Sequence, residues 1–279
     1  MKISIAVPSF NYARFLRQCL DSIATQSHQD IEVLIADGGS SDGSIEIIEA
    51  YCQADPRFKF VSRSDTGQAD AIKRAFAHAS GDILCFLNAD DCFLHSDVFS
   101  TVLHDFQKNP QVSVLTYGGD YLNAEGNKIK RINYRYHPMD GFHWMRYRTA
   151  IIQPATFWLK HVYNPEEWPS NYHFVFDVVF FYQAYLKYQW MESSTPVAGY
   201  RLHGENKSMS VKSKRVFELA AFEELKFGNG SFRARYLKIL ATLISKLETM
   251  GSLGKRLTHA IYLFNNSLSF LSFYRIPGI

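Results

Sequence analysis

The first hundred residues alternate between short apolar runs and segments with helical spacing of apolar side chains, and this alternation constrains the fold most. Four apolar runs, at 3–7, 31–36, 58–61 and 83–87, predict strands. The segments between them place apolar residues three and four positions apart, which predicts helices. Repeated strand–helix units form a parallel sheet with right-handed connections. We therefore expect a Rossmann-like α/β fold with a mixed, mostly parallel sheet flanked by helices.

The rest of the chain departs from this regular pattern. Helices are predicted at 96–108 and 177–187, and strands at 112–117 and 197–202. Between 121 and 190 the pattern is irregular, and this segment holds 19 of the 42 Phe, Tyr and Trp residues. We expect a body over 1–206 that divides into two halves, 1–117 and 118–206. A helical extension is expected over 207–279.

The predicted extension carries a charge opposite to that of the body. Residues 207–279 contain 12 Lys and Arg against 4 Asp and Glu, whereas the remaining residues contain 18 against 23. Basic residues interleaved with Leu, Ile and Phe are typical of a helix that binds an anionic membrane surface. Packing on the body, or pairing of two chains in a homodimer, is the alternative that the sequence leaves open.

Polar turns follow each of the four predicted strands of the first half. In parallel sheets, ligands bind beside the carboxyl ends of the strands. Those ends carry Ser9, Asp37, Asp65 and Asn88 with their neighbours. One such turn alone is explained by ordinary turn chemistry. Four in succession predict a ligand site at one edge of the sheet.

The pair Asp90–Asp91 is the most specific of these features. Two adjacent carboxylates at the end of a buried strand repel each other unless a cation compensates them. Mg²⁺ and Mn²⁺ favour oxygen ligands and commonly bind together with substrate phosphates. The pair therefore predicts a divalent metal beside a diphosphate.

Six segments together carry a family resemblance. They are VPSFN at 7–11, IADGGSSDGS at 35–44, DTGQADA at 65–71, FLNADD at 86–91, QPATFW at 153–158 and RLH at 201–203. In this order and spacing, the chain resembles family 2 of the glycosyltransferases, which have the GT-A fold, over roughly residues 1–206.

The resemblance implies an inverting transfer from a nucleotide-diphospho-sugar, commonly UDP-linked. It makes 1–117 the nucleotide-sugar-binding half of the body and 118–206 the acceptor half. It implies that the metal is held by Asp90, Asp91 and His203. Asn88 stands where the family usually has the first aspartate of a D-x-D-type motif, and an amide is a poorer metal ligand. The donor-binding residues implied by the resemblance are Pro8, Ser9, Asn11, Asp37, Asp65, Gln68, Asn88, Asp90 and Arg201.

The resemblance also implies a catalytic base at the start of a late helix. Asp177 is the only acidic residue between Glu167 and Glu192, so it is the candidate. Such a base accepts the proton of the acceptor hydroxyl. The acidic and basic neighbours usual in the family are replaced here by Phe176, Val179 and Gln183, and a simple helix N-cap is the alternative.

Aromatic faces pack on the C–H faces of sugars, so the aromatic segment also predicts an acceptor surface. We expect Trp144, Trp158 and Trp168 to contribute to it, and most of the other aromatic residues to fill the core.

The sequence thus predicts a metal-dependent glycosyltransferase acting on a glycan or lipid-linked saccharide. A non-catalytic carbohydrate or membrane-surface binding protein on the same scaffold is the first alternative. A sugar nucleotidyltransferase would need a glycine-rich phosphate loop where this chain has Pro8–Asn11, and an oxidoreductase would need G-x-G-x-x-G there. No nucleic-acid-binding module is recognised.

The cellular location is predicted from two sequence features, membrane-spanning segments and signal peptides. No apolar run approaches the roughly 18 residues of a membrane span, and the first strand directly follows Met1–Lys2 without a signal peptide. We expect a cytoplasmic protein, peripheral at the inner face of the membrane.

Overall fold

The computed structural model describes residues 1–132, 151–204, 213–229, 231–254, 256–258 and 261. The chain forms two compact units. The first comprises Met1–Arg135, Ile151–Ser170 and Gln183–Leu202, and the second comprises Tyr136–Ala150, Asn171–Tyr182 and His203–Ile279.

The first unit contains a nine-stranded sheet whose first half is parallel. Its strands run in the order β3-β2-β1-β4-β8-β6-β9-β5, and β7 pairs with β6. Parallel pairing joins β1 to β2 and β4, β2 to β3, and β6 to β9. Antiparallel pairing joins β8 to β4 and β6, β5 to β9, and β7 to β6. The bounds are β1 Ile3–Ser9, β2 Ile31–Asp37, β3 Phe58–Ser62, β4 Ile83–Phe86, β5 Cys92–Phe93, β6 Val114–Leu122, β7 Lys128–Ile132, β8 Thr156–Leu159 and β9 Trp190–Arg201.

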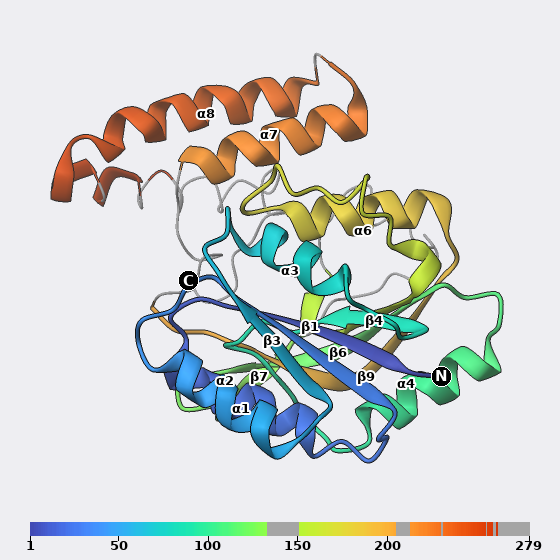
Figure 1. Ribbon diagram of the computed structural model, residues 1–279. Helices are drawn as coiled ribbons and strands as arrows, with labels where there is room; N and C mark the ends of the chain where they lie inside the picture. The colour runs from blue at the N-terminus through green and yellow to red at the C-terminus, as the bar shows by residue number, and fades with distance from the viewer. Residues whose placement is uncertain (133–150, 205–212, 230, 255, 259–260, 262–279) are drawn as a thin grey trace. The chain divides into compact units, whose positions relative to one another are not determined.

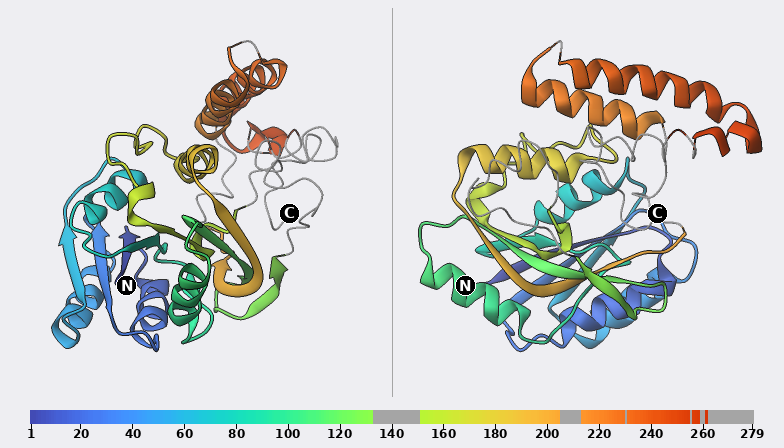
Figure 2. Two further views of the ribbon diagram at one scale, coloured as in Figure 1. Left: turned by 90° about the vertical axis from the view of Figure 1, so that its right-hand side faces the viewer. Right: turned by 180° about the vertical axis from the view of Figure 1, so that it is seen from behind.

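Helices cover both faces of this sheet. Figures 1 and 2 show α1 (Ala13–Ala24), α2 (Ser44–Ala54) and α4 (Val98–Lys108) on one face and α3 (Gln68–Phe76) on the other. β1, β2 and β4 are buried along their whole length, because both faces are covered. This explains why their sequences are apolar without alternation.

The expected α/β fold is confirmed, and the differences lie in the second half. β9 begins at Trp190, well before the predicted strand at 197, and β6 extends to Leu122. β5, β7 and β8 were not predicted. β5 has two residues and β8 four, too few to show a period, and both gain their pairing from strands distant in the sequence.

The second unit contains a helical hairpin with its own apolar core. Its helices are α7 (Ser213–Phe227) and α8 (Phe232–Glu248), and Ser231 caps α8 by accepting a hydrogen bond from the Ala234 N–H. α6 (Phe176–Lys187) begins in this unit. The core of the second unit consists of Val175, Val179, Tyr182, Val216, Leu219, Ala220, Phe222, Leu237, Ala241 and Ile244.

None of the helices within the described part of the chain combines the length and the apolar character needed to cross a bilayer.

A buried carboxylate ties the amino ends of β1 and β2 together. Glu32 is 3% exposed and lies opposite Ser4 in the register of the two strands. Its oxygens accept hydrogen bonds from the hydroxyl of Ser4 (2.6 Å), the N–H and hydroxyl of Ser80 (2.6 and 2.9 Å), and Nζ of Lys2 (3.1 Å). Burial alone would raise the pKa of Glu32, but these hydrogen bonds outweigh it and lower the pKa to about 2.

This arrangement predicts a pH-dependent contribution to stability. Because the folded pKa is depressed, the ionised carboxylate stabilises the fold above its ordinary pKa, and this contribution decreases as pH falls towards 2. Glu32→Gln should lower the free energy of unfolding by about 2 kcal/mol at pH 7, and less at pH 3. Urea unfolding at both pH values measures the difference, with the exposed Glu49→Gln as control. An equal deficit at both pH values would contradict the assignment.

Candidate functional site

The loops after β1 and β2 are held together by side-chain oxygens. Asp37, fully buried at the end of β2, accepts hydrogen bonds from the N–H groups of Gly39 (3.0 Å) and Ser40 (2.9 Å) and from the Ser62 hydroxyl (2.7 Å). The Asn11 side chain accepts from the N–H of Ser41 (2.8 Å). These bonds give the two loops a fixed shape.

Backbone conformation explains two residue types in these loops. Asn11 has φ 57°, a left-handed conformation that asparagine tolerates better than most residues. A Cβ at Gly38 would lie 2.9 Å from Oδ2 of Asp65 and 3.1 Å from the Phe10 ring. Glycine at this position therefore lets the loops after β1, β2 and β3 approach one another closely.

The predicted donor residues of these loops lie at the carboxyl ends of neighbouring strands. Ser9 pairs with Asp37 in the register of β1 and β2, and the Ser9 hydroxyl is buried without a hydrogen-bond partner among the described residues. Pro8 lies one position earlier on β1 and is also buried. Asp65, after β3, accepts from Nη2 of Arg74 (3.1 Å) and the N–H of Gly67 (2.9 Å).

A network of amide side chains lies at the end of β4. Gln68 donates from Nε2 to Oδ1 of Asn88. Nδ2 of Asn88 donates to Oε1 of Gln153 (3.0 Å) and to Oδ2 of Asp91 (3.3 Å). Gln153 in turn donates to the carbonyl of Phe86 (2.7 Å). Asn88 can donate and accept at once, which an aspartate in its place could not do while ionised.

Asp90 and Asp91 form the buried acidic turn of the site. They are 8% and 1% exposed, and Oδ1 of Asp91 accepts the main-chain N–H of Arg201 (2.9 Å). Burial and the neighbouring charge of Asp90 raise the pKa of Asp91, whereas its hydrogen bonds and the Arg201 charge oppose this rise. The turn thus places two carboxyl groups side by side at low exposure.

Arg201 is buried beneath this turn and directed into the protein. Its guanidinium donates to the main-chain carbonyls of Asp90 (2.6 Å), Asn123 (3.3 Å) and Ala124 (3.1 Å) and to Gln18, and lies 5.1 Å from the Phe15 ring centre. The sequence predicted that Arg201 binds the donor. At 1% exposure, with its donors directed to protein acceptors, it instead holds the acidic turn in place.

Two of the predicted acceptor tryptophans lie in the core. Trp158 is 0% and Trp168 4% exposed, and both pack edge-on against Phe76 and Phe86. Nε1 of Trp168 donates to the carbonyl of Ala69 (2.8 Å). Neither ring offers a face to a sugar, because the aromatic cluster covers both. Trp144 lies outside the described residues.

The remaining predicted site residues belong to the second unit. Asp177 lies in the first turn of α6, where its Oδ1 accepts the N–H of Val178 (2.9 Å). His203, 8% exposed, follows β9. Asp90, Asp91 and the loops after β1 to β4 belong to the first unit.

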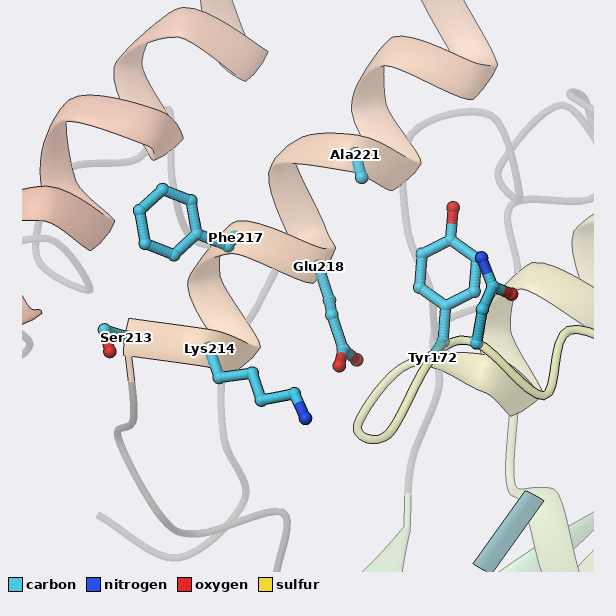
Figure 3. A pocket seen from close by; sticks show the side chains of 7 residues that line it. Tyr172, Ser213, Lys214, Phe217, Glu218 and Ala221 are labelled. Atoms are coloured by element: carbon cyan, nitrogen blue, oxygen red, sulfur yellow. The ribbon is translucent and has the colours of Figure 1, made fainter. Parts of the chain in front are cut away.

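The second unit also contains an open pocket, shown in Figure 3. Its volume is about 470 Å³, and it is lined by Asn171, Tyr172, Ser213, Lys214, Phe217, Glu218 and Ala221. Lys214 is exposed, whereas Glu218 is buried and directed to the segment that precedes α6.

The donor set at the acidic turn fits a divalent cation. Within the described ranges, no cluster of three or more His, Cys, Asp and Glu side chains converges. Asp90 and Asp91 nevertheless supply oxygen ligands, and a cation would offset both the burial and the Asp90 charge, which together raise the pKa of Asp91. Mg²⁺ typically needs only one or two carboxylates when substrate phosphates complete its shell.

Sequence reasoning missed two residues that organise the site. Gln153 lies within the QPATFW segment that contributed to the resemblance, yet no role was assigned to it. Gln18 lies on α1 and receives Nη2 of Arg201, 183 positions away in the chain. The motif could have indicated Gln153, whereas no local pattern indicates Gln18.

The contacts of Arg201 predict a marked loss of stability when it is shortened. Arg201→Lys removes the planar fork that reaches four acceptors and leaves buried carbonyls without donors, which should cost about 2–4 kcal/mol. Arg14→Lys, an exposed arginine beside the same Phe15 ring, should change stability by less than about 0.5 kcal/mol. Chemical unfolding of both variants measures this, and equal stabilities would refute the buried role.

Comparison with known proteins agrees with this geometry. Residues 4–187 match the family model described as glycosyl transferase family 2. Chondroitin synthase of Escherichia coli is 28% identical over 153 residues, which cover 55% of this chain and 21% of the synthase. The chain covers 36% or less of the length of the first curated relatives that it matches.

Solved structures share the fold at low sequence identity. TarS 1–349 of S. aureus, in complex with UDP-GlcNAc, superposes with a TM-score of 0.67 at 17% identity, covering 87% of this chain and 71% of that one. The mannosyltransferase PcManGT of Pyrobaculum calidifontis, in complex with GDP-Man and Mn²⁺, gives 0.63 at 15% identity over 98% and 83%. Because the family model matches well over half of the chain, this protein belongs to glycosyl transferase family 2, and it has the GT-A fold.

Proposed function

We propose that this chain is an inverting glycosyltransferase that moves a sugar from a nucleotide-diphospho-sugar, UDP-linked in the first instance, to a glycan or lipid-linked saccharide. The buried Asp90–Asp91 turn carries the proposal, because it lies at the sheet edge where β1, β2 and β4 end. The likeness to chondroitin synthase supports synthesis of a surface polysaccharide.

The donor is proposed to lie across the loops after β1 to β4. Ser9 and Asp37 end β1 and β2 on the nucleotide side, where Asn11 follows β1, while Asp65 lies in the loop after β3 and Gln68 begins α3. The loops have fixed hydrogen bonds before any donor binds, so little conformational entropy is lost on binding. Arg201 acts in this proposal as a positioning residue beneath the acidic turn.

Asp90 and Asp91 are proposed to hold a Mg²⁺ or Mn²⁺ ion, with His203 as a further candidate ligand. When bound, the ion neutralises negative charge on the departing diphosphate. PcManGT in complex with GDP-Man and Mn²⁺ supports this assignment.

Asp177 is proposed as the general base. Its carboxylate accepts the proton of the acceptor hydroxyl while that oxygen bonds to the anomeric carbon, and the bond from that carbon to the diphosphate breaks on the opposite side. The nucleoside diphosphate leaves with the electron pair.

Donor binding and hydrolysis test the function without a known acceptor. UDP-Glc, UDP-GlcNAc, UDP-Gal and GDP-Man are each added with Mn²⁺, and the preferred donor should raise the thermal midpoint most. Asp91→Asn should remove this shift and Mn²⁺-dependent donor hydrolysis. Asp177→Asn should keep the shift and lower hydrolysis at least about 100-fold.

Asp97→Asn, an exposed aspartate after the same turn, is the matched control and should change neither quantity. If none of the four donors is hydrolysed, the non-catalytic binding alternative is favoured. If Asp177→Asn hydrolyses the donor at the normal rate, Asp177 is not the base.

We further propose that α8 binds an anionic membrane surface. Beside its buried stripe, α8 has an exposed one that includes Phe232, Arg235, Ile239, Leu243 and Lys246. Apolar and basic residues on one face are typical of interfacial helices.

Cosedimentation with vesicles tests this proposal. The chain should bind vesicles with 30% phosphatidylserine at low salt, bind pure phosphatidylcholine vesicles much less, and lose binding in Ile239→Glu. Equal binding to both vesicle types, or none to either, would refute it.

A further inference from the structure

The carboxylate of Glu218 binds three consecutive main-chain N–H groups in the second unit. It accepts from His173 (2.9 Å), Phe174 (2.7 Å) and Val175 (3.3 Å). Glu218 lies on α7 and is 9% exposed, and Figure 3 shows its side chain extending from α7 towards the segment that carries Tyr172. An acidic side chain from one helix therefore fixes the backbone immediately before another.

This contact gives hydrogen-bond acceptors to three main-chain N–H groups that would destabilise the fold if they were left without them. Three adjacent N–H groups in a partly buried segment need acceptors, and water or a neutral side chain would satisfy them less strongly than a carboxylate. Burial together with the charge of Glu218 raises the pKa of Tyr172, the residue before the segment. Glu218 is therefore suited to hold this backbone in one conformation.

The held segment leads directly into the turn that carries Asp177. α6 begins at Phe176, and the N–H of Val179 donates to the carbonyl of Val175 (3.0 Å). Asp177 accepts the N–H of Val178, so the direction of its side chain depends on the backbone that Glu218 fixes.

Apolar packing fixes the same turn from a second direction. Val175 and Val179 belong to one core cluster with Val216, Leu219 and Phe222 of α7. The hydrogen bonds set the path of the chain into α6, and the packing sets the rotation of α6 about its axis. α7 thus determines both the path of the chain into the first turn of α6 and the rotation of that turn about the helix axis.

We propose that Glu218 is a positioning residue for Asp177, so that the C-terminal hairpin supports catalysis directly. The proposal rests on the assignment of Asp177 as the base. Glu218 does not touch the reacting atoms; it orients the carboxylate that does. Residues beyond 206 then contribute to transfer and not only to location.

Glu218→Gln tests the proposal, because it keeps the size of the side chain but removes its charge and one acceptor oxygen. Hydrogen exchange of the full-length chain should accelerate at 173–175 by about tenfold or more. In Mn²⁺-dependent hydrolysis of the preferred donor, kcat should fall at least tenfold while the donor KM stays within twofold. The acid limb of the kcat profile against pH should shift.

Two variants on the same helix serve as matched controls. Glu223→Gln disturbs a buried pairing with Lys226 and Arg233, and Glu224→Gln disturbs an exposed pair with Lys238. Glu223→Gln should destabilise the hairpin without changing the pH profile, and Glu224→Gln should change little.

The outcomes separate this inference from the proposed function. If Glu218→Gln and Glu223→Gln lower kcat equally, the loss comes from a weakened hairpin and the inference is overturned. Unchanged exchange at 173–175 also overturns it. If Asp177→Asn remains fully active, the base assignment fails, and faster exchange in Glu218→Gln then reports a structural contact only.

A shorter variant covers the case in which Glu218→Gln does not fold. Glu218→Asp keeps the charge and withdraws it by one methylene. This variant should also lower kcat while leaving the donor KM unchanged, but by a smaller factor than Glu218→Gln. An unchanged kcat would overturn the inference.

Discussion

The candidate site depends on the placement of one buried cation, Arg201, beneath two buried carboxylates. Removing Asp90 and Asp91 from water is unfavourable, and their mutual repulsion adds to that cost. Arg201 reduces it by donating its main-chain N–H to Asp91 and its guanidinium to the Asp90 carbonyl. The cost of burying the acidic turn is thus offset from within the protein, by the backbone and the guanidinium of one residue.

Strand order explains why so many polar side chains lie at this edge of the sheet. β4, β1, β2 and β3 are parallel neighbours, so the loops that follow them emerge at the same edge. Each loop is stabilised by residues of the next: Asn11 binds Ser41, Asp37 binds Ser62, and Gln68 binds Asn88. The loops therefore form one hydrogen-bonded system in which each shape depends on its neighbour.

Local sequence patterns predicted the parallel half of the fold and the turns at its edge, because buried strands and their loops are encoded within a few residues. They did not predict the direction of long side chains. Arg201 was expected to bind the donor, yet its acceptors include Gln18 and the 123–124 carbonyls, far away in the chain. Trp158 was expected at the surface, yet Phe76 and Phe86 cover it.

The net charge of residues 207–279, counted from the sequence, likewise does not show where the charged side chains lie. The four acidic residues of this segment are all bound within the second unit: Glu218 by backbone, Glu223 and Glu224 by basic side chains, and Glu248 by Ser213. Arg235 and Lys246, in contrast, are exposed on α8. A net charge counted from the sequence treats these groups alike. In the structure Glu223 and Glu224 each pair with basic side chains and Glu218 with backbone, whereas Arg235 and Lys246 are exposed on α8, so the position of each charge matters more than the sum.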